Sequence, residues 1–347
     1  MSTLAEFMNA HRVTNGTYTH VTFGHKGFPT ASSHGNGKYN IALDERKVFS
    51  ELVAKAAFGS SKTKFFIVER SEAYGPIRID LDFKYTVDPA HVVQGQPPRF
   101  YKSSLIDDLV AKLATTIHEI VQIPYEDLAK RMLFVFEKPA ASPAQTADDG
   151  TVALWKDGLH IMMPRVITSP AVQRLIRAEM LDLLGPLCES HKAEGVTPTN
   201  SAEDMYDDSV LERNGWPVWG SVKEGAQPYY LASMWNTSGK GVHRYSDSEM
   251  QKEEFSSVQV QLSMLYSSQQ YNPASKSAQY FIQYLSIQGY DENDQQELTD
   301  YARSEVRKLQ DAEREAAIQK KKNIAGPHFV VKTHDDLLLV LKLVDLL

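Results

Sequence analysis

The sequence has little cysteine, no long apolar segment and no excess of basic charge. Its 347 residues contain one cysteine, Cys188, so a disulfide within the chain and a zinc site built from cysteines are excluded. A lone thiol fits a reducing, intracellular compartment. Met1 to Ala10 lacks the basic and apolar parts of a signal peptide, and no run approaches a membrane span. We therefore expect no membrane partner.

Two further absences narrow the class of protein. Lys and Arg number 37 against 44 Asp and Glu, a net charge of −7, so any polyanionic partner must meet a local basic surface. The pattern Gly-x-x-x-x-Gly-Lys-Ser/Thr is missing, which excludes a P-loop ATPase within this chain. A hydrophobic share of 42% and a charged share of 23% are ordinary for globular proteins. The length fits two domains, or one large domain with a tail.

The hydrophobic pattern alternates between strand and helix periods and predicts a mixed fold. The expected strands span 65–69, 77–85, 132–137 and 159–163, with Pro164 ending the last. The expected helices span 44–58, 103–121, 169–184 and 297–322, followed by an apolar helix over 337–347. Turn-forming residues predict loops over 88–99, 139–150 and 237–244.

The segment Ile77 to Tyr85 places two acids on one face of a strand. Alternate strand residues share a face, so Asp80 and Asp82 project together, away from the apolar residues between them. Adjacent carboxylates repel unless a cation lies between them, and oxygen ligands favour Mg²⁺ or Mn²⁺. Two solvated acids flanked by Arg78 and Lys84 would give the same pattern, so both interpretations stay open.

A second motif lies within the segment 155–164. Lys156, Gly158 and His160 alternate and so share one strand face, where Lys and His can donate to phosphate oxygens and Gly permits close approach of a ligand. Taken alone, this pattern favours a surface lysine beside a buried histidine.

A third motif begins at Asp207-Asp208, passes Arg213 and ends in Gly220-Ser221-Val222-Lys223. It supplies another acid and then a Gly-Ser turn with a lysine. Taken alone, it is also compatible with a polar loop anchored by aromatic residues.

In this order the three motifs resemble the archaeo-eukaryotic primase superfamily, in particular the N-terminal primase domain of poxvirus-type primase-helicases of nucleocytoplasmic large DNA viruses. The opening matches as well, from the Gly-rich turn into Lys38-Tyr39-Asn40-Ile41 to Val68-Glu69-Arg70 and Gly75-Pro76. The resemblance runs from Thr19 to Tyr230. It implies an α+β fold in which an N-terminal α/β unit and an RRM-like antiparallel sheet flank the site.

The resemblance also implies roles for single residues. It assigns the metal ions, Mg²⁺ or Mn²⁺ in a two-metal site, to Asp80, Asp82 and Asp207. The nucleotide-binding residues that it implies are Lys156, Gly158, His160, Ser221, Lys223 and Arg213. Two departures stand out: Gly158 replaces a frequent serine, and Pro217 and Val218 stand where relatives carry an arginine, for which Arg213 is the substitute. Spacing to Lys223 favours Asp207 over Asp208 as the third acid.

The implied activity is a DNA primase or polymerase that makes or extends primers on single-stranded DNA from nucleoside triphosphates, at a viral replication site in the host cytoplasm or nucleus. Residues 1–290 would form the catalytic domain and 291–347 a helical connector to a linked or associated helicase. The apolar end resembles the start of such a segment, so we expect the natural chain to continue. Candidate template contacts are Lys240, His243 and Arg244, with Lys320 to Lys322 more simply solvated charges.

Three other classes use the same residues differently. A metal-dependent nuclease or other transferase would share the acids, but a nuclease would degrade DNA without a nucleoside triphosphate. A primase-fold module without catalysis would bind DNA only. A structural domain would serve assembly of the helicase.

Overall fold

The computed structural model describes residues 3–23, 36–59, 64–146, 150, 152–246 and 276–324. The chain divides into two compact units, 1–303 and 304–347. The second contains most of helix α11 (Asp300–Ile324), which covers most of the helix predicted over 297–322. The apolar helix predicted over 337–347 lies outside the described residues. None of the described helices combines the length and the apolar character that a membrane crossing needs.

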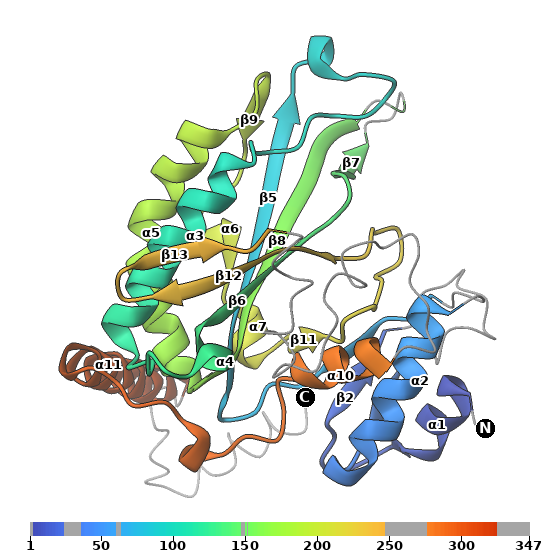
Figure 1. Cartoon of the computed structure of the whole chain (residues 1–347), viewed down its shortest axis with the longest axis vertical. Helices are drawn as coiled ribbons and strands as arrows, with labels where there is room; N and C mark the ends of the chain where they lie inside the picture. The colour runs from blue at the N-terminus through green and yellow to red at the C-terminus, as the bar shows by residue number, and fades with distance from the viewer. Residues whose placement is uncertain are drawn as a thin grey trace, which may run out of the picture. The chain divides into compact units, whose positions relative to one another are not determined.

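A small antiparallel sheet forms the N-terminal part of the first unit (Figure 1). Its five strands lie in the order β1-β3-β2-β4-β11. Their bounds are Arg12–Val13 (β1), His20–Thr22 (β2), Gly37–Tyr39 (β3), Ile67–Glu69 (β4) and Trp216–Pro217 (β11). The helices associated with this sheet are α1 (Leu4–Ala10), α2 (Arg46–Phe58) and α10 (Lys276–Tyr284), with the 3₁₀ turn η1 (Leu43–Glu45) before α2. Buried side chains of these helices and of the sheet share one hydrophobic core.

The second sheet has eight strands, six of them in the order β10-β5-β8-β6-β12-β13, with β9 pairing with β5 and β7 with β8. The bounds are Gly75–Val87 (β5), Met132–Glu137 (β6), Ser142–Thr146 (β7), Val152–Thr168 (β8), Val196–Pro198 (β9), Tyr206–Asp207 (β10), Tyr230–Ser238 (β12) and Gly241–Arg244 (β13). The two long helices α3 (Ser104–Ile120) and α5 (Pro170–His191) lie side by side beside it (Figure 1). The shorter helices are α4 (Leu128–Arg131), α6 (Ala202–Met205) and α7 (Ser209–Glu212), with 3₁₀ turns η2 (Pro89–His91) and η4 (Glu292–Asp294).

Sequence patterning explains the long elements of this sheet. Leu105, Leu109 and Leu113 follow the helical period, and all three are buried in α3. On β5 the apolar residues Ile79 and Leu81 are buried on the face opposite the acids. The mixture of helices with antiparallel sheet is consistent with the predicted α+β class.

Three local predictions were wrong. The strand predicted to end at Pro164 continues to Thr168, because the register of β5 against β8 shifts beside Pro76 and an irregular ladder tolerates proline. The loop predicted over 139–150 contains β7. The loop predicted over 237–244 is the end of β12, a tight turn and β13. Pairing with distant strands overrides the turn-forming composition in both loops.

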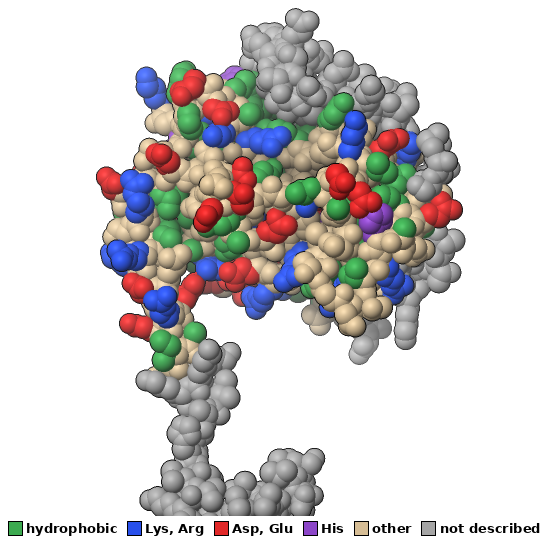
Figure 2. All heavy atoms as spheres, turned by 90° about the horizontal axis from the view of Figure 1, so that it is seen from below, with side chains coloured by type: hydrophobic (Ala, Val, Ile, Leu, Met, Phe, Trp, Pro, Cys, Tyr) green, Lys and Arg blue, Asp and Glu red, His purple; other side chains and the backbone are tan. Residues whose placement is uncertain are grey.

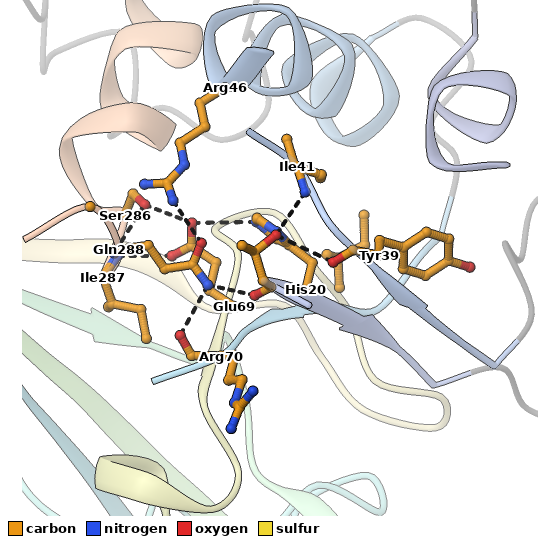
Figure 3. Close-up of polar contacts among 12 residues, drawn as sticks. His20, Tyr39, Ile41, Arg46, Glu69, Arg70, Ser286, Ile287 and Gln288 are labelled. Atoms are coloured by element: carbon orange, nitrogen blue, oxygen red, sulfur yellow. Dashed lines mark hydrogen bonds and ion pairs between the residues drawn. The ribbon is translucent and has the colours of Figure 1, made fainter. Parts of the chain in front are cut away.

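A buried polar network ties the segment after α10 to the small sheet (Figure 3). The Glu69 carboxylate accepts hydrogen bonds from Ser286 Oγ at 2.7 Å and from the Ile287 amide at 2.9 Å. His20 Nε2 lies 3.6 Å from Glu69 Oε1. Gln288 donates to the backbone carbonyl of Arg70 at 3.0 Å. The segment 286–288 is therefore an integral part of the first unit.

Candidate functional site

Neighbouring strands of the large sheet bring the predicted motifs into register. Asp207 on β10 lies opposite Asp80 on β5, and Asp80 lies opposite His160 on β8. Asp82 lies opposite Gly158 one pleat further along. Directly opposed residues of antiparallel strands share a face of the sheet. The acids and the histidine, far apart in sequence, therefore form one row across three strands.

A pocket of about 430 Å³ covers this row. Its other wall comes from the small sheet, through Val68 and Pro217. The predicted site residues that line it are Asp80, Asp82, Asp207, Lys156, His160, Ser221 and Lys223. The site thus lies between the two sheets of the first unit.

The acids of β5 face basic groups of β8. Lys156 Nζ lies 2.8 Å from Asp82 Oδ2, and His160 Nε2 lies 3.4 Å from Asp80 Oδ1. Burial opposes ionisation of Asp80, but His160, Lys156 and Lys138 together hold its pKa below the ordinary value. Among the described residues, none donates a hydrogen bond to the buried Asp80 Oδ1. That oxygen keeps its negative charge and retains capacity for a ligand.

The residues present fit a divalent cation by their chemistry. Asp80, Asp82 and Asp207 offer only carboxylate oxygens, the donors that Mg²⁺ and Mn²⁺ prefer. Within the described ranges, no three acidic, histidine or cysteine side chains already form a closed cation-binding cluster. Without a cation, the charges of the acids are balanced by Lys156 and His160 of β8. Binding of a metal ion by Asp82 would therefore replace its contact with Lys156.

The third acid is held by the turn that follows it. The Asp207 carboxylate accepts hydrogen bonds from the amide and the hydroxyl of Ser209, both at 2.8 Å. Asp208 lies outside the pocket lining and 3.4 Å from Arg213, whose side chain is 75% exposed. Arg213, expected as a substitute phosphate ligand, is therefore placed at the surface beside Asp208.

Arg78 is buried, contrary to the interpretation that it flanks the acids in water. Its guanidinium donates to the carbonyls of Val210 at 3.3 Å and Leu211 at 2.9 Å, both in α7. Burial lowers its pKa to about 10. Since α7 directly follows Asp207, Arg78 links β5 to the segment that carries the third acid.

Ser221 holds the turn that carries Lys223. Its hydroxyl donates to the carbonyl of Ile67 at 3.0 Å and accepts from the Ile67 amide at 3.1 Å. These bonds fasten the Gly220-Ser221 turn to β4. Lys223 thereby reaches the pocket from the small-sheet side.

Among the pocket residues that the sequence reasoning missed are Lys138 and Tyr229, which contact each other and the predicted His160. The Tyr229 ring stacks on the His160 ring, with centroids 3.6 Å apart and an interplanar angle of 17°. A Cβ on Gly158 would come within 3.0 Å of the Tyr229 hydroxyl and 2.7 Å of the Leu81 carbonyl oxygen. The absence of a side chain at Gly158 therefore makes room for Tyr229 and for β5. The one local signal for Lys138 was its place directly after a predicted strand.

The predicted template contacts lie away from the pocket. Lys240, His243 and Arg244 are exposed on the β12–β13 hairpin, and none of them lines the pocket. Arg244 lies 3.3 Å from Asp107. The side chains of Lys320 to Lys322 lie outside the described residues. Figure 2 shows basic and acidic side chains interspersed over one face of the molecule.

Comparison with known proteins assigns this chain to a protein family. Residues 30–235 match the family model described as the C962R protein N-terminal AEP domain, and the matched range contains both β5 and β8 and the whole Asp207 to Lys223 motif. The chain belongs to this family of archaeo-eukaryotic primase domains, so the predicted resemblance is confirmed. Members of this superfamily are typically nucleotidyltransferases.

One curated relative is the "Putative helicase L207/L206" of Acanthamoeba polyphaga mimivirus. It is 29% identical to this chain over 211 residues, which is 60% of this chain and 20% of the relative. The chain therefore spans about a fifth of the length of that viral protein.

Proposed function

We propose that this chain catalyses DNA-templated nucleotidyl transfer, making or extending primers on single-stranded DNA during viral replication. The observation that carries the proposal is the row of Asp207, Asp80 and His160 across three strands, with Asp82 and Lys156 beside it in one pocket. Carboxylates on one side and phosphate-binding cations on the other are what transfer of a nucleotide needs.

Each group has a distinct part in the proposed reaction. Asp80, Asp82 and Asp207 would hold two divalent ions, Mg²⁺ or Mn²⁺, which when bound supply activation of the attacking 3′-hydroxyl and charge stabilisation of the leaving pyrophosphate. His160 and Lys223 would donate to the triphosphate oxygens. Lys156, once Asp82 is engaged elsewhere, would join them and align the nucleotide for in-line attack.

We also propose that the large sheet with α3 and α5 is the RRM-like part of the fold and that the small sheet with α2 is the N-terminal α/β unit. Residues 1–290 would form the catalytic domain and 291–347 the connector. The viral relative named as a helicase is about five times longer than the matched segment. This supports a helicase, linked or associated, as the partner of this chain.

The test is incubation of the chain with single-stranded DNA, labelled nucleoside triphosphates and Mg²⁺ or Mn²⁺, with and without a primer. We expect template-directed incorporation with release of pyrophosphate. Degradation of DNA without nucleotide would instead assign a nuclease. DNA binding without either reaction would assign a module without catalysis.

A further inference from the structure

Lys138 is a buried cation at the wall of the pocket. Its residue is 7% exposed, and it lines the same pocket as Asp80 and Asp82. It directly follows β6, where Phe136 pairs with His160, so continuing the antiparallel register places Lys138 opposite Gly158. Lys138 therefore lies in line with Gly158 and Asp82, beside the row of Asp207, Asp80 and His160.

The cations of the pocket differ in what they contact. Lys156 pairs with Asp82, and His160 faces Asp80. Lys138 Nζ lies 4.9 Å from the centroid of the Tyr229 ring, and in the described part of the chain it has no hydrogen bond and no ion pair. Burying an ammonium group without a directly bonded anion costs free energy, which the more distant carboxylates of the site offset only in part. An anion in the pocket would remove that cost.

Tyr229 contacts two basic residues of the pocket. The ring stacks on His160 at 3.6 Å, and the Lys138 ammonium lies against the same tyrosine at 4.9 Å. A cation against an aromatic ring and a stacked pair of rings are both attractive. Tyr229 thus acts as a spacer that fixes the positions of His160 and Lys138 relative to each other.

The backbone of Lys138 is fixed from the opposite side. Arg99 donates to the Lys138 carbonyl at 2.7 Å and forms two hydrogen bonds, at 2.6 and 2.9 Å, with the fully buried Asp157. Asp157 lies on β8 directly before Gly158. This arrangement holds the end of β6 to the interior of β8, which restricts the backbone at Lys138.

We propose that Lys138 is a phosphate-binding residue of this site, placed by Tyr229 and Arg99 to contact the polyphosphate of the incoming nucleotide. The inference rests on the proposed function and adds to it a phosphate ligand that neither strand motif contains. Burial and the charge of Lys156 lower the pKa of Lys138, and the nearby carboxylates of Asp82, Asp80 and Asp157 offset this only in part.

The test measures binding of inorganic tripolyphosphate and of a nucleoside triphosphate, each with Mg²⁺, to the full chain by calorimetry. Lys138→Met keeps the apolar stem and removes the charge, and should weaken both affinities about ten- to a hundredfold. Lys138→Arg should restore much of the loss. Lys112→Met removes one charge from an exposed site on α3, outside the pocket lining, and should change affinity by less than about twofold. Affinity for single-stranded DNA should stay unchanged in all three.

Tyr229, which contacts both His160 and Lys138, gives a second comparison. Tyr229→Leu removes the ring but leaves Lys138 in place, and should weaken tripolyphosphate binding roughly two- to thirtyfold, whereas Tyr229→Phe keeps the ring and should bind like the wild type. If the wild type binds tripolyphosphate and folded Lys138→Met binds it equally well, the inference is overturned while the proposed function stands. If Lys138→Met does not fold, wild-type affinity in Tyr229→Leu overturns it. A wild type that neither binds nor incorporates nucleotide contradicts the proposed function itself.

Discussion

Two carboxylate–histidine pairs in the first unit have similar geometry and different surroundings. Glu69 Oε1 lies 3.6 Å from His20 Nε2, and Asp80 Oδ1 lies 3.4 Å from His160 Nε2. Glu69 also accepts hydrogen bonds from Ser286 and the Ile287 amide, and it lies under the segment after α10 (Figure 3). Asp80 opens into the pocket with an oxygen that accepts no hydrogen bond from the described residues.

The difference separates a structural pair from a binding pair. Burial opposes the charge of both acids, yet in both the neighbouring histidine helps to hold the carboxylate pKa below its ordinary value. At Glu69 the protein itself supplies the remaining donors, so nothing further is needed. At Asp80 the remaining position faces a pocket shared with Asp82 and Asp207, where the proposed divalent cation would bind.

The largest effect should come from the binding pair. Asp80→Asn or Asp82→Asn should lower nucleotide incorporation by roughly a thousandfold or more, because loss of a metal ligand removes several kcal/mol of transition-state stabilisation. The variants should still fold, since asparagine keeps the shape of aspartate and only one ion pair with a neighbouring basic group is lost. Asp208→Asn, outside the pocket, is the matched control and should incorporate normally. Normal incorporation by Asp80→Asn would show that Asp80 does not take part in the reaction.

The structural pair should respond in the opposite way. Glu69→Ala leaves His20, Ser286 and the Ile287 amide buried without their partner, so we expect a loss of about 3 kcal/mol in the free energy of unfolding. Chemical denaturation measures this loss. Incorporation per folded molecule should stay near the wild-type value. A variant of unchanged stability and lost activity would place Glu69 in the reaction instead.

A smaller effect concerns pH. Because the folded-state pKa of Glu69 lies below 4.5, its ionised form contributes stability in full above that pH and loses it as the pH falls through the lowered value. The difference in melting temperature between the wild type and Glu69→Gln should therefore be constant near neutral pH and shrink in acid. If this difference in melting temperature persisted unchanged to pH ~3, Glu69 would not be stabilised in its ionised form by its partners.

The smallest effect is expected from the C-terminal unit. Glu297 accepts from the Gln122 amide at 2.8 Å and the Gln296 amide donates to Ile167 at 2.9 Å, so residues beyond 290 remain attached to the first unit. A chain ending after Arg303 should keep incorporation within about twofold of the full chain, since no pocket residue is lost. A chain ending after Leu285 loses the partners of Glu69 and should unfold more readily. An inactive but folded 1–303 chain would show that the connector takes part in catalysis.

Local pattern was enough to place Asp80 and Asp82 on one strand face, whereas their role and that of Asp207 came from the family resemblance. Strand alternation put Asp80 with Asp82 and Lys156 with His160, and each pair lines the pocket as expected. The pairing of Asp207 with Asp80 could not be derived from spacing, because β10 is a two-residue strand whose partner is far away in sequence.

The missed residues share a physical cause. Lys138 reaches the pocket through the register of β6 with β8, and Tyr229 through the register of β12 with β6, and no local period encodes either register. Arg78 was expected in water because alternation puts it on the face of the acids. Its burial follows from α7, which covers that end of the strand and supplies carbonyl partners.

Manganese binding tests most directly the contrast between Asp80, proposed to bind a metal ion, and Glu69, which has a structural role. Electron paramagnetic resonance would follow Mn²⁺ binding, in the presence of a non-hydrolysable nucleoside triphosphate, by the wild type, Asp80→Asn and Glu69→Gln. The comparison of the two pairs predicts bound Mn²⁺ in the wild type and in Glu69→Gln, and loss of the bound signal in Asp80→Asn. Equal binding by the wild type and Asp80→Asn, or loss confined to Glu69→Gln, would contradict it.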